Sequence, residues 1–398
     1  MSVPNRFPDT EPFGACPPLS GLKVLDFTWA AAGPVATTFL AFLGADVVKV
    51  EQSSRPDLMR VSDRQYGYGA VTSYNESPLF NELASGKRSI ELNLADPADH
   101  KVALELAAEA DVLIENMRPG KFEKLGMSPE RLRELNPGLV MCSVSATGRS
   151  SVAGPPGYAP VFWAEGGGAW LTGWPDRPPG LVRGPVDLHA AAFACLGIVS
   201  LLRRRERTGE GGYLDCSAVE AVTAVIGAQL IEAQSDLPEP VRRGNDFPGT
   251  LVNDVFPCAG EDQWLALTLR DEADVTRLIE VLHEQFGASL SPQDVLDADN
   301  AWKNIARVSQ ALDVVELERS LVAAGVPAAQ STSLRTAMSD SRLTERQALQ
   351  SIFHDALGEQ VIVALPWFVD GAPYAVRGPA PVLGADRDDV LREWLGAP

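Results

Sequence analysis

The fold of this chain follows from the segment GLKVLDFTWAAAGPVATTFLAFLGADVVKVE, which runs from Gly21 to Glu51. Its first part, Gly21 to Phe27, predicts a buried strand, and Ala36 to Leu43 predicts the helix that follows. Ala45 to Glu51 predicts a second strand that ends in an acid. A strand, a turn that contains glycine, a helix and an acid-terminated strand are typical of a nucleotide-binding βαβ unit.

The turn of this unit does not have the pattern of a dinucleotide site. Domains that bind NAD carry Gly-x-Gly-x-x-Gly between the strand and the helix, whereas Gly33 is the only glycine in this turn. Glu51 fits either a ribose-binding acid or a solvated strand end. The segment therefore predicts an α/β fold and gives little support to NAD binding.

Further strands follow at intervals along the chain. Ser89 to Leu94 alternates polar and apolar residues, and Asp111 to Glu115 and Leu139 to Val144 are short and apolar. The second of these runs into the turn Asn116 to Gly120, which carries Arg118. Since α/β proteins bind ligands at the carboxyl ends of their strands, this turn is a candidate for binding an anion. Arg118 fits a solvated surface charge equally well.

The pattern changes beyond residue 235. Residues 236–249 and 334–344 predict linkers, and residues 250–333, a hairpin followed by helices, predict a small α+β domain. Residues 1–235 and 345–398 are expected to form one large domain, because the final proline-rich segment and its helix predict a return to the first domain. The first twenty residues, rich in proline, predict an arm.

Composition narrows the class of protein. The 398 residues contain 34 Lys and Arg against 53 Asp and Glu, a formal net charge of -19 that disfavours nucleic acid as a partner. The five cysteines have no paired spacing, so no metal site is predicted and a reduced, cytoplasmic setting is expected. No segment of eighteen apolar residues lacks a polar break, so we expect no membrane partner.

A second segment, GGGAWLTGWPDRPP, carries the strongest candidate for chemistry. It places Asp176 on a loop stiffened by Pro175, Pro178 and Pro179, directly after a run of glycines. Taken alone, these residues fit a catalytic carboxylate or an aspartate that caps a turn beside its prolines.

Short motifs lie in order along nearly the whole chain. None is specific alone, but together they resemble the family III CoA-transferases, the CaiB/BaiF group that includes formyl-CoA:oxalate and carnitine CoA-transferases. The resemblance implies an α/β fold with a Rossmann-like large domain formed by both chain ends, a small α+β domain and an interlocked dimer. The motifs are VLDFT at 24–28, AGP at 32–34, LGADVVKVE at 43–51, KRSIEL at 87–92, ADVLIEN at 110–116, RPG at 118–120, NP at 136–137, Arg205 with TG at 208–209, and PAPVLG at 379–384.

The resemblance assigns a role to the second segment. In that family the nucleophile is an aspartate in Thr-Gly-x-x-Asp-x-Pro-Pro, and Thr172 to Pro179 matches every fixed position. It implies that Asp176 is catalytic and that CoA moves from an acyl-CoA thioester to a free carboxylic acid through covalent aspartyl intermediates. The amides of Gly166, Gly167 and Gly168 are candidates for stabilising the oxyanions.

The resemblance also implies where coenzyme A thioesters bind as substrates, without a tightly bound cofactor. The chain departs from formyl-CoA transferase at Ala31, Gln52, Ala95 and Ser145, where that enzyme has a glutamine, an arginine and two lysines. Its tetraglycine loop is also absent. These departures favour a larger acid, aromatic or branched, over oxalate or formate. The implied CoA-binding positions are Trp29, Ala30, Ala32, Leu92, Asn116, Met117, Arg118, Lys124 and Leu125.

Two alternatives stay open at this point. The α-methylacyl-CoA racemases share the fold and use a His and an Asp; Asp187 matches the Asp, but Tyr158 stands at the His position. With a reference pKa of about 10, tyrosine is a poor proton shuttle at neutral pH. The other alternative is a non-catalytic subunit that pairs with a catalytic homologue. We therefore expect a homodimer, or a heteromer with a homologous subunit.

Overall fold

The computed structural model describes residues 17–61, 73–149, 157–182, 184–236, 238–297, 299–369 and 371–397. Most of the predicted N-terminal arm lies outside these residues. The chain divides into two compact units. The large unit comprises Met1–Ala169, Leu181–Asp236 and Ser341–Pro398, and the small unit comprises Trp170–Gly180 and Leu237–Asp340.

The large unit is built on a parallel sheet of six strands in the order β3-β2-β1-β4-β5-β6. This confirms the predicted mixed α/β fold with a parallel sheet. The strand order reverses between β1 and β4, which lie side by side in the sheet. The strands are β1 Lys23–Phe27, β2 Asp46–Glu51, β3 Arg88–Glu91, β4 Val112–Glu115, β5 Val140–Ser145 and β6 Gly212–Ser217.

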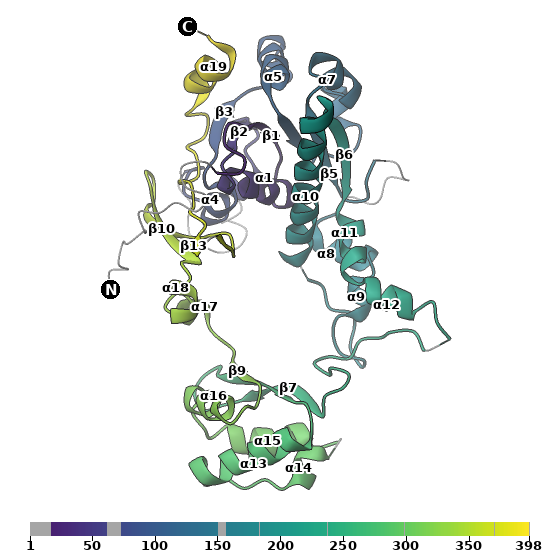
Figure 1. The fold of residues 1–398 in the computed structure, drawn as a ribbon, viewed down its shortest axis with the longest axis vertical. Helices are drawn as coiled ribbons and strands as arrows, with labels where there is room; N and C mark the ends of the chain where they lie inside the picture. The colour runs from purple at the N-terminus through teal and green to yellow at the C-terminus, as the bar shows by residue number, and fades with distance from the viewer. Residues whose placement is uncertain are drawn as a thin grey trace. The chain divides into compact units, whose positions relative to one another are not determined.

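Successive strand residues point to opposite sides of the sheet, and consecutive residues here are apolar, so both faces of the sheet are apolar. Val24 belongs to the cluster that packs against α1 (Ala32–Phe42) and α10 (Gly184–Thr208). Its neighbour Leu25 belongs to the cluster that includes residues of α5 (Pro97–Glu109) and α19 (Arg387–Leu395). Figure 1 shows these helices around the sheet. The sheet is therefore covered on both faces.

Helix α1 begins at Ala32, four residues before the predicted start at Ala36. We predicted a turn at Gly33-Pro34, but proline is tolerated in the first turn of a helix, where its missing N–H costs no hydrogen bond. Gly33 is required there because a Cβ atom at this position would lie 2.5 Å from the side chain of Thr28.

Helix α10 is, within the part of the chain that the structure describes, the one helix long and apolar enough to cross a bilayer by length and composition. One of its faces lies in the core of the large unit, against α1, β5 and β6. Packing thus explains the apolar residues of this face. The buried side chains are Val186, Ala190, Ala191, Ala194, Ile198 and Leu202.

The C-terminal segment is hydrogen-bonded to earlier parts of the large unit. Gly384 N donates to Ser89 Oγ at 3.0 Å, and Asp386 Oδ2 accepts from Ser89 N at 2.7 Å. The carbonyl of Pro381 accepts a hydrogen bond from Arg60 at 3.1 Å. Residues more than 290 positions apart in sequence therefore share one network.

Shorter elements complete the large unit, except that α17 and the end of α9 belong to the small unit. Two antiparallel hairpins, β10-β11 and β12-β13, precede the C-terminal segment. Their bounds are β10 Leu349–His354, β11 Gly358–Val363, β12 Phe368–Val369 and β13 Ala372–Pro373. The helices are α2 Leu58–Val61, α4 Pro78–Ala84, α6 Lys121–Lys124, α7 Pro129–Leu135, α8 Ala159–Glu165, α9 Gly168–Leu171, α11 Ala218–Val225, α12 Gly227–Glu232, α17 Leu334–Ala337 and α18 Ser341–Thr344.

The small unit contains an antiparallel sheet in the order β7-β8-β9 with its own apolar core. The predicted hairpin is present as β7 (Val252–Pro257) and β8 (Trp264–Leu269). The third strand, β9 (Ala328–Gln330), was not predicted, because three residues are too few to show an alternating pattern. The helices are α13 Glu272–Phe286, α14 Pro292–Leu296, α15 Ala301–Ser309 and α16 Val314–Ala323.

Candidate functional site

Two turns meet where the strand order of the large sheet reverses. One follows β1 and contains Trp29, and the other follows β4 and begins at Asn116. The Trp29 N–H donates to Asn116 Oδ1 at 2.7 Å, and Asn116 Nδ2 donates to the Trp29 carbonyl at 2.6 Å. Such a switch point is the usual ligand site of open α/β sheets. The structure thus brings together two of the predicted CoA-binding residues.

A buried ion pair supports the first of these turns. Lys49 Nζ lies 3.0 Å from Asp57 Oδ2 and donates to the Thr28 carbonyl at 2.6 Å. Asp57 Oδ1 in turn accepts from the Ala30 N–H at 3.1 Å. Ala30 has φ +61°, a left-handed conformation that costs energy for a residue other than glycine. The ion pair therefore stabilises a strained backbone at this edge.

A second buried group lies beneath the same turn. Asp26 accepts hydrogen bonds from the hydroxyls of Thr28 and Thr37, each at 2.6 Å, and Lys87 Nζ lies 3.4 Å away. Burial works to raise the pKa of Asp26, but Lys87, Lys49 and the two hydroxyls outweigh it and hold that pKa below its ordinary value. Burial lowers the pKa of Lys87 to about 8, although Asp26 opposes the shift.

Glu51 is not a solvated strand end. Its two carboxylate oxygens accept from Arg60 Nε at 2.8 Å and Nη2 at 2.7 Å, and both side chains are buried. Burial works to raise the pKa of Glu51, but the hydrogen bonds and charge of Arg60, together with Lys49 and Ser89, hold it below its ordinary value. This acid is committed to an internal ion pair.

The other predicted CoA-binding positions have different surroundings. Ala32 starts α1, whose N-terminus opens at the same edge, and Arg118 is exposed in the second turn. Met117 N–H donates to the Glu115 carboxylate at 2.7 Å. Leu92 is only 2% exposed and belongs to the apolar core, so its side chain has a packing role.

Two more predicted positions lie at α6. Lys124 is exposed at its end, and the carbonyl of Leu125 contacts His100 Nε2 at 2.7 Å. Of the departures from formyl-CoA transferase, Ala95 is exposed, whereas Ser145 is buried at the end of β5. Its Oγ has no hydrogen-bond partner within the described residues.

Asp176 belongs to the small unit, in the loop Trp170–Gly180. The loop is closed by a hydrogen bond from Gly180 N to the Thr172 carbonyl at 2.8 Å, and Gly173 has φ +108°. Arg177 N donates to the Trp174 carbonyl at 3.2 Å, which makes the turn that carries the aspartate. The Asp176 side chain is exposed in the chain alone. It is therefore presented on a tight turn with its carboxylate accessible.

The sequence model of CoA-transferase family III matches residues 19–387. This chain belongs to CoA-transferase family III. The match includes the whole Asp176 loop and both turns at the edge of the large sheet.

Characterised relatives of this family III chain are CoA-transferases. It is 30% identical over 398 residues to succinyl-CoA:mesaconate CoA-transferase of Haloarcula marismortui, covering 94% of this chain and 96% of that protein. It is 29% identical over 399 residues to the succinyl-CoA–L-malate CoA-transferase beta subunit of Chloroflexus aurantiacus, covering 95% and 94%. The protein is therefore an enzyme that transfers CoA.

A solved structure shows the same fold. The CaiB/BaiF family protein of Brucella suis superposes with a TM-score of 0.82 at 24% identity, covering 95% of this chain and 99% of that one. The architecture implied by the resemblance is thereby confirmed for the parallel sheet and its helices.

The glycine run of the CoA-transferase has a packing role in the structure. A Cβ atom on Gly166 would lie 2.7 Å from Val222, and one on Gly168 would lie 2.6 Å from the ring of Trp163. The amides of Gly166 and Gly167 donate to the carbonyls of Phe162 and Ala164. An oxyanion role would require those two bonds to be replaced, and it stays a prediction.

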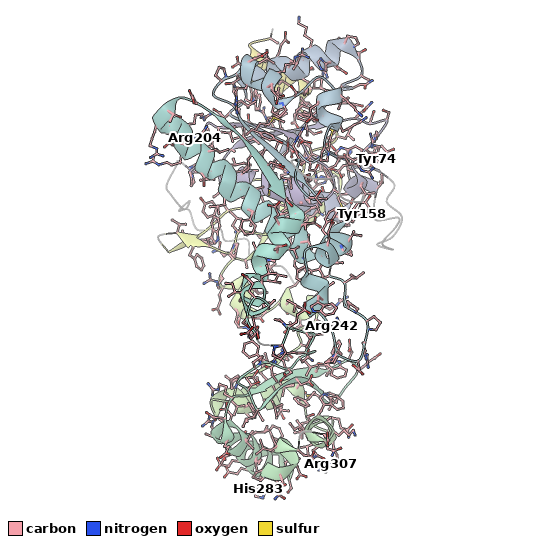
Figure 2. The ribbon with its side chains drawn as sticks, turned by 90° about the vertical axis from the view of Figure 1, so that its right-hand side faces the viewer. Tyr74, Tyr158, Arg204, Arg242, His283 and Arg307 are labelled. Atoms are coloured by element: carbon pink, nitrogen blue, oxygen red, sulfur yellow. The ribbon has the colours of Figure 1, made fainter. Side chains whose placement is uncertain are left out.

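The racemase-like positions of this family III chain differ in their surroundings. Tyr158, labelled in Figure 2, precedes α8 and is 67% exposed. Asp187 lies in the first turn of α10, where burial raises its pKa to about 6. Asp187 is therefore suited to accept a proton near neutral pH, whereas Tyr158 is not.

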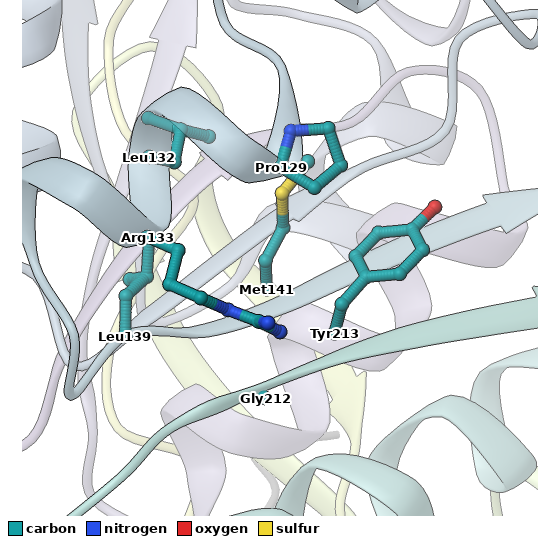
Figure 3. A pocket seen from close by; sticks show the side chains of 7 residues that line it. All are labelled: Pro129, Leu132, Arg133, Leu139, Met141, Gly212 and Tyr213. Atoms are coloured by element: carbon teal, nitrogen blue, oxygen red, sulfur yellow. The ribbon is translucent and has the colours of Figure 1, made fainter.

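A small pocket of the enzyme opens at the opposite edge of the large sheet (Figure 3). Met141 and Gly212, at the amino ends of β5 and β6, line it together with Tyr213 and Arg133 of α7. Ligands of open α/β sheets bind at the carboxyl ends of the strands. This pocket is consequently not the expected CoA site.

Proposed function

We propose that Asp176 is the nucleophile of this CoA-transferase. The observation that carries the proposal is the match of Thr172 to Pro179 to the family's catalytic motif at every fixed position, in a chain that belongs to the family over most of its length. An exposed carboxylate on a turn whose prolines have a fixed φ suits the role. It can attack the donor thioester, and the acylated aspartyl carbonyl can then be attacked, without rearrangement of the loop.

The proposed reaction has four acyl-transfer steps. The Asp176 carboxylate attacks the donor thioester carbonyl, which forms a mixed anhydride and releases CoA thiolate. The thiolate attacks the aspartyl carbonyl, which forms an aspartyl thioester and releases the donor acid. The acceptor carboxylate then attacks this thioester, forms a second mixed anhydride and releases the thiolate again. The thiolate finally takes the new acyl group, and Asp176 is regenerated as a carboxylate.

The CoA moiety is assigned to the edge of the large sheet where Trp29 and Asn116 meet. The backbone amides that open α1 at Ala32 suit phosphate groups, and Arg118 and Lys124 add positive charge. Leu92 and Leu125 would contribute through backbone or apolar contacts. These cations supply the local positive charge that a protein with a net charge of -19 needs to attract an anionic substrate.

Asn116→Asp is expected to weaken CoA binding about 5- to 150-fold, because the carboxylate cannot donate to the Trp29 carbonyl, a loss of about 1–3 kcal/mol. Asn136→Asp is the matched control, since Asn136 Nδ2 donates to the carbonyls of Ala108 and Ala110 at the end of α5, ahead of the amino end of β4. Isothermal titration with CoA measures both. Equal affinity losses in the two variants would contradict the assignment.

We assign the acids to the dicarboxylic class. Mesaconate and L-malate, named for the two relatives, are dicarboxylic acids, and mesaconate is also methyl-branched, so these names favour a dicarboxylic acid over an aromatic one. Arg177, adjacent to Asp176, has no carboxylate partner among the described residues. A guanidinium in that position suits the second carboxylate of such an acid.

Trapping of the intermediate tests the proposed function. The wild-type enzyme is incubated with succinyl-CoA, treated with hydroxylamine, digested, and mapped by mass spectrometry. A hydroxamate on Asp176 is the expected product, since hydroxylamine attacks both the anhydride and the thioester. Unmodified Asp176 with every succinyl, acetyl and formyl donor would contradict the proposal.

The racemase is retained as the second candidate because of Asp187. Its pKa of about 6 suits a base that removes an α-proton. Incubation of a 2-methylacyl-CoA in deuterated water, followed by mass spectrometry of the thioester, distinguishes the two reactions. Deuterium uptake that is lost in Asp187→Asn, without any label on Asp176, would favour the racemase.

A homodimer is proposed from the exposed face of α10. Leu188, Phe193, Leu196 and Val199 are each at least 40% exposed, although the opposite face of this helix lies in the core. Apolar surface on a core helix is usually covered in the assembled protein. A second copy of the chain is the proposed cover, and a homologous subunit is the alternative, since one relative is named as a beta subunit.

Leu196→Glu is expected to convert the assembly to monomers, because the new carboxylate would be buried without a partner in the interface. Light scattering after size-exclusion chromatography measures the mass. Leu135→Glu, at a similarly apolar but isolated position on α7 that is 45% exposed, is the control and should leave the mass unchanged. A wild-type protein that is already monomeric would contradict the proposal.

A further inference from the structure

Arg242 connects the loop of the proposed nucleophile to the segment that precedes β7 in the small unit (Figure 2). Its Nη1 donates to the Trp170 carbonyl at 3.2 Å, and its Nε donates to the Trp174 carbonyl at 3.4 Å. The guanidinium also lies 5.4 Å from the centre of the Trp170 ring. One side chain thus contacts both ends of the first half of the loop.

Backbone contacts reinforce this connection. Gly244 N donates to the Gly173 carbonyl at 2.8 Å, and Trp170 Nε1 donates to the Pro240 carbonyl at 2.9 Å. A Cβ atom on Gly244 would lie 2.7 Å from the Trp174 indole. Gly244 therefore permits a close approach that brings the Arg242 side chain within reach of the loop.

The guanidinium is used here for its geometry. Its planar fork donates from two nitrogens to two carbonyls in fixed directions, which an ammonium group cannot reproduce. No carboxylate within the described residues pairs with Arg242. Its hydrogen bonds go to the loop that carries Asp176, two residues after Trp174.

We propose that Arg242 is a positioning residue for the nucleophile, an inference that rests on the proposed role of Asp176. By holding the Trp170 and Trp174 carbonyls, Arg242 fixes the backbone on which the carboxylate is presented. Attack on a thioester requires near-contact distance and alignment, and a displacement of about 1 Å costs about 10²-fold in rate. Arg242 therefore acts on kcat through the loop, while the CoA-binding positions are assigned to the large unit.

The test compares Arg242→Met and Arg242→Lys with Arg243→Met. Methionine keeps much of the stem and lysine keeps the charge, while Arg243 is the exposed neighbouring arginine. We expect kcat to fall about 10²-fold in both Arg242 variants with KM for the acyl-CoA within about threefold of wild type. Arg243→Met should behave as wild type. A kcat within threefold of wild type in Arg242→Met would overturn the proposal.

Hydrogen exchange gives a readout that does not depend on activity. In Arg242→Met, peptides that cover residues 170–180 should exchange at least about tenfold faster, because the loop opens locally once its two side-chain bonds are lost. Peptides of α13 should not change. Unchanged exchange in the loop would overturn the proposal even if Asp176 is labelled in the trapping experiment. If Asp176 of the wild-type enzyme is not labelled, the proposed nucleophile is refuted. The exchange rate then still decides whether Arg242 holds the loop.

Discussion

Replacement of Asp176 by alanine is expected to lower kcat by on the order of 10⁴-fold, because no covalent intermediate can form without the carboxylate. Binding of CoA should change little, since the proposed CoA-binding positions lie in the large unit and Asp176 lies in the small one. Steady-state kinetics with succinyl-CoA and a dicarboxylic acceptor measures kcat, and titration with CoA measures affinity.

Two further variants sharpen this prediction. Asp176→Asn keeps the size of the side chain but removes the nucleophilic oxygen, so it should match alanine at early times and regain activity only if the amide hydrolyses. Asp246→Asn, an exposed aspartate in the same unit, is the control and should retain wild-type kcat. A reduction of less than tenfold in Asp176→Ala would show that this carboxylate is not the nucleophile.

Replacement of Glu51 by glutamine is expected to lower the free energy of unfolding by about 3–5 kcal/mol, because it leaves the Arg60 charge buried without its carboxylate. The side chains are 1% and 0% exposed, so water cannot replace the lost partner. Urea denaturation monitored by tryptophan fluorescence measures the change. A loss below about 1 kcal/mol would contradict the prediction, since exposed pairs reach that value.

Controls separate burial from charge in this experiment. Glu105→Gln breaks the pair with Lys101, whose side chains are 47% and 77% exposed, and should cost no more than about 0.5 kcal/mol. The double variant Glu51→Gln/Arg60→Met should lose less free energy of unfolding than the sum of the losses in the two single variants, because neither charge is then left buried alone.

The acid dependence of stability follows from the same group. The folded-state pKa of Glu51 lies below its unfolded value, so its contribution is complete above the unfolded pKa, near 4.5, and is lost as the pH falls through the folded pKa. Asp26 behaves in the same way. Glu51→Gln should therefore show a shallower loss of stability below about pH 4.5 than wild type.

The strands of the sheet were predictable because most of them are short apolar runs. Ala45 to Glu51 and Asp111 to Glu115 differ from β2 and β4 by one residue at most. The start of α1 was less predictable, since Gly33 and Pro34 are as typical of a turn as of a first helical turn. Strand β9 was missed because three residues carry no period.

The candidate site was predictable only in part. Asn116 was a candidate because its turn follows a strand, and the family resemblance added Trp29; the structure joins the two directly. The ion pair of Lys49 and Asp57 was missed, because a lysine within an apolar strand gives no indication of which acid it pairs with, here one eight residues away. Arg242 was missed for the same reason, since its bonds go to backbone carbonyls about seventy residues earlier.

The hydrogen bonds that join the C-terminal segment to α2 and β3 affect how the chain folds during its synthesis. A ribosome synthesises the chain from its N-terminus, so Arg60 and Ser89 are made at least 295 residues before their partners Pro381, Gly384 and Asp386. Until then Arg60 of α2 and Ser89 of the edge strand β3 lack these partners. The large unit therefore forms these contacts only once two segments far apart in sequence have both been synthesised, and contacts of such large sequence separation form slowly.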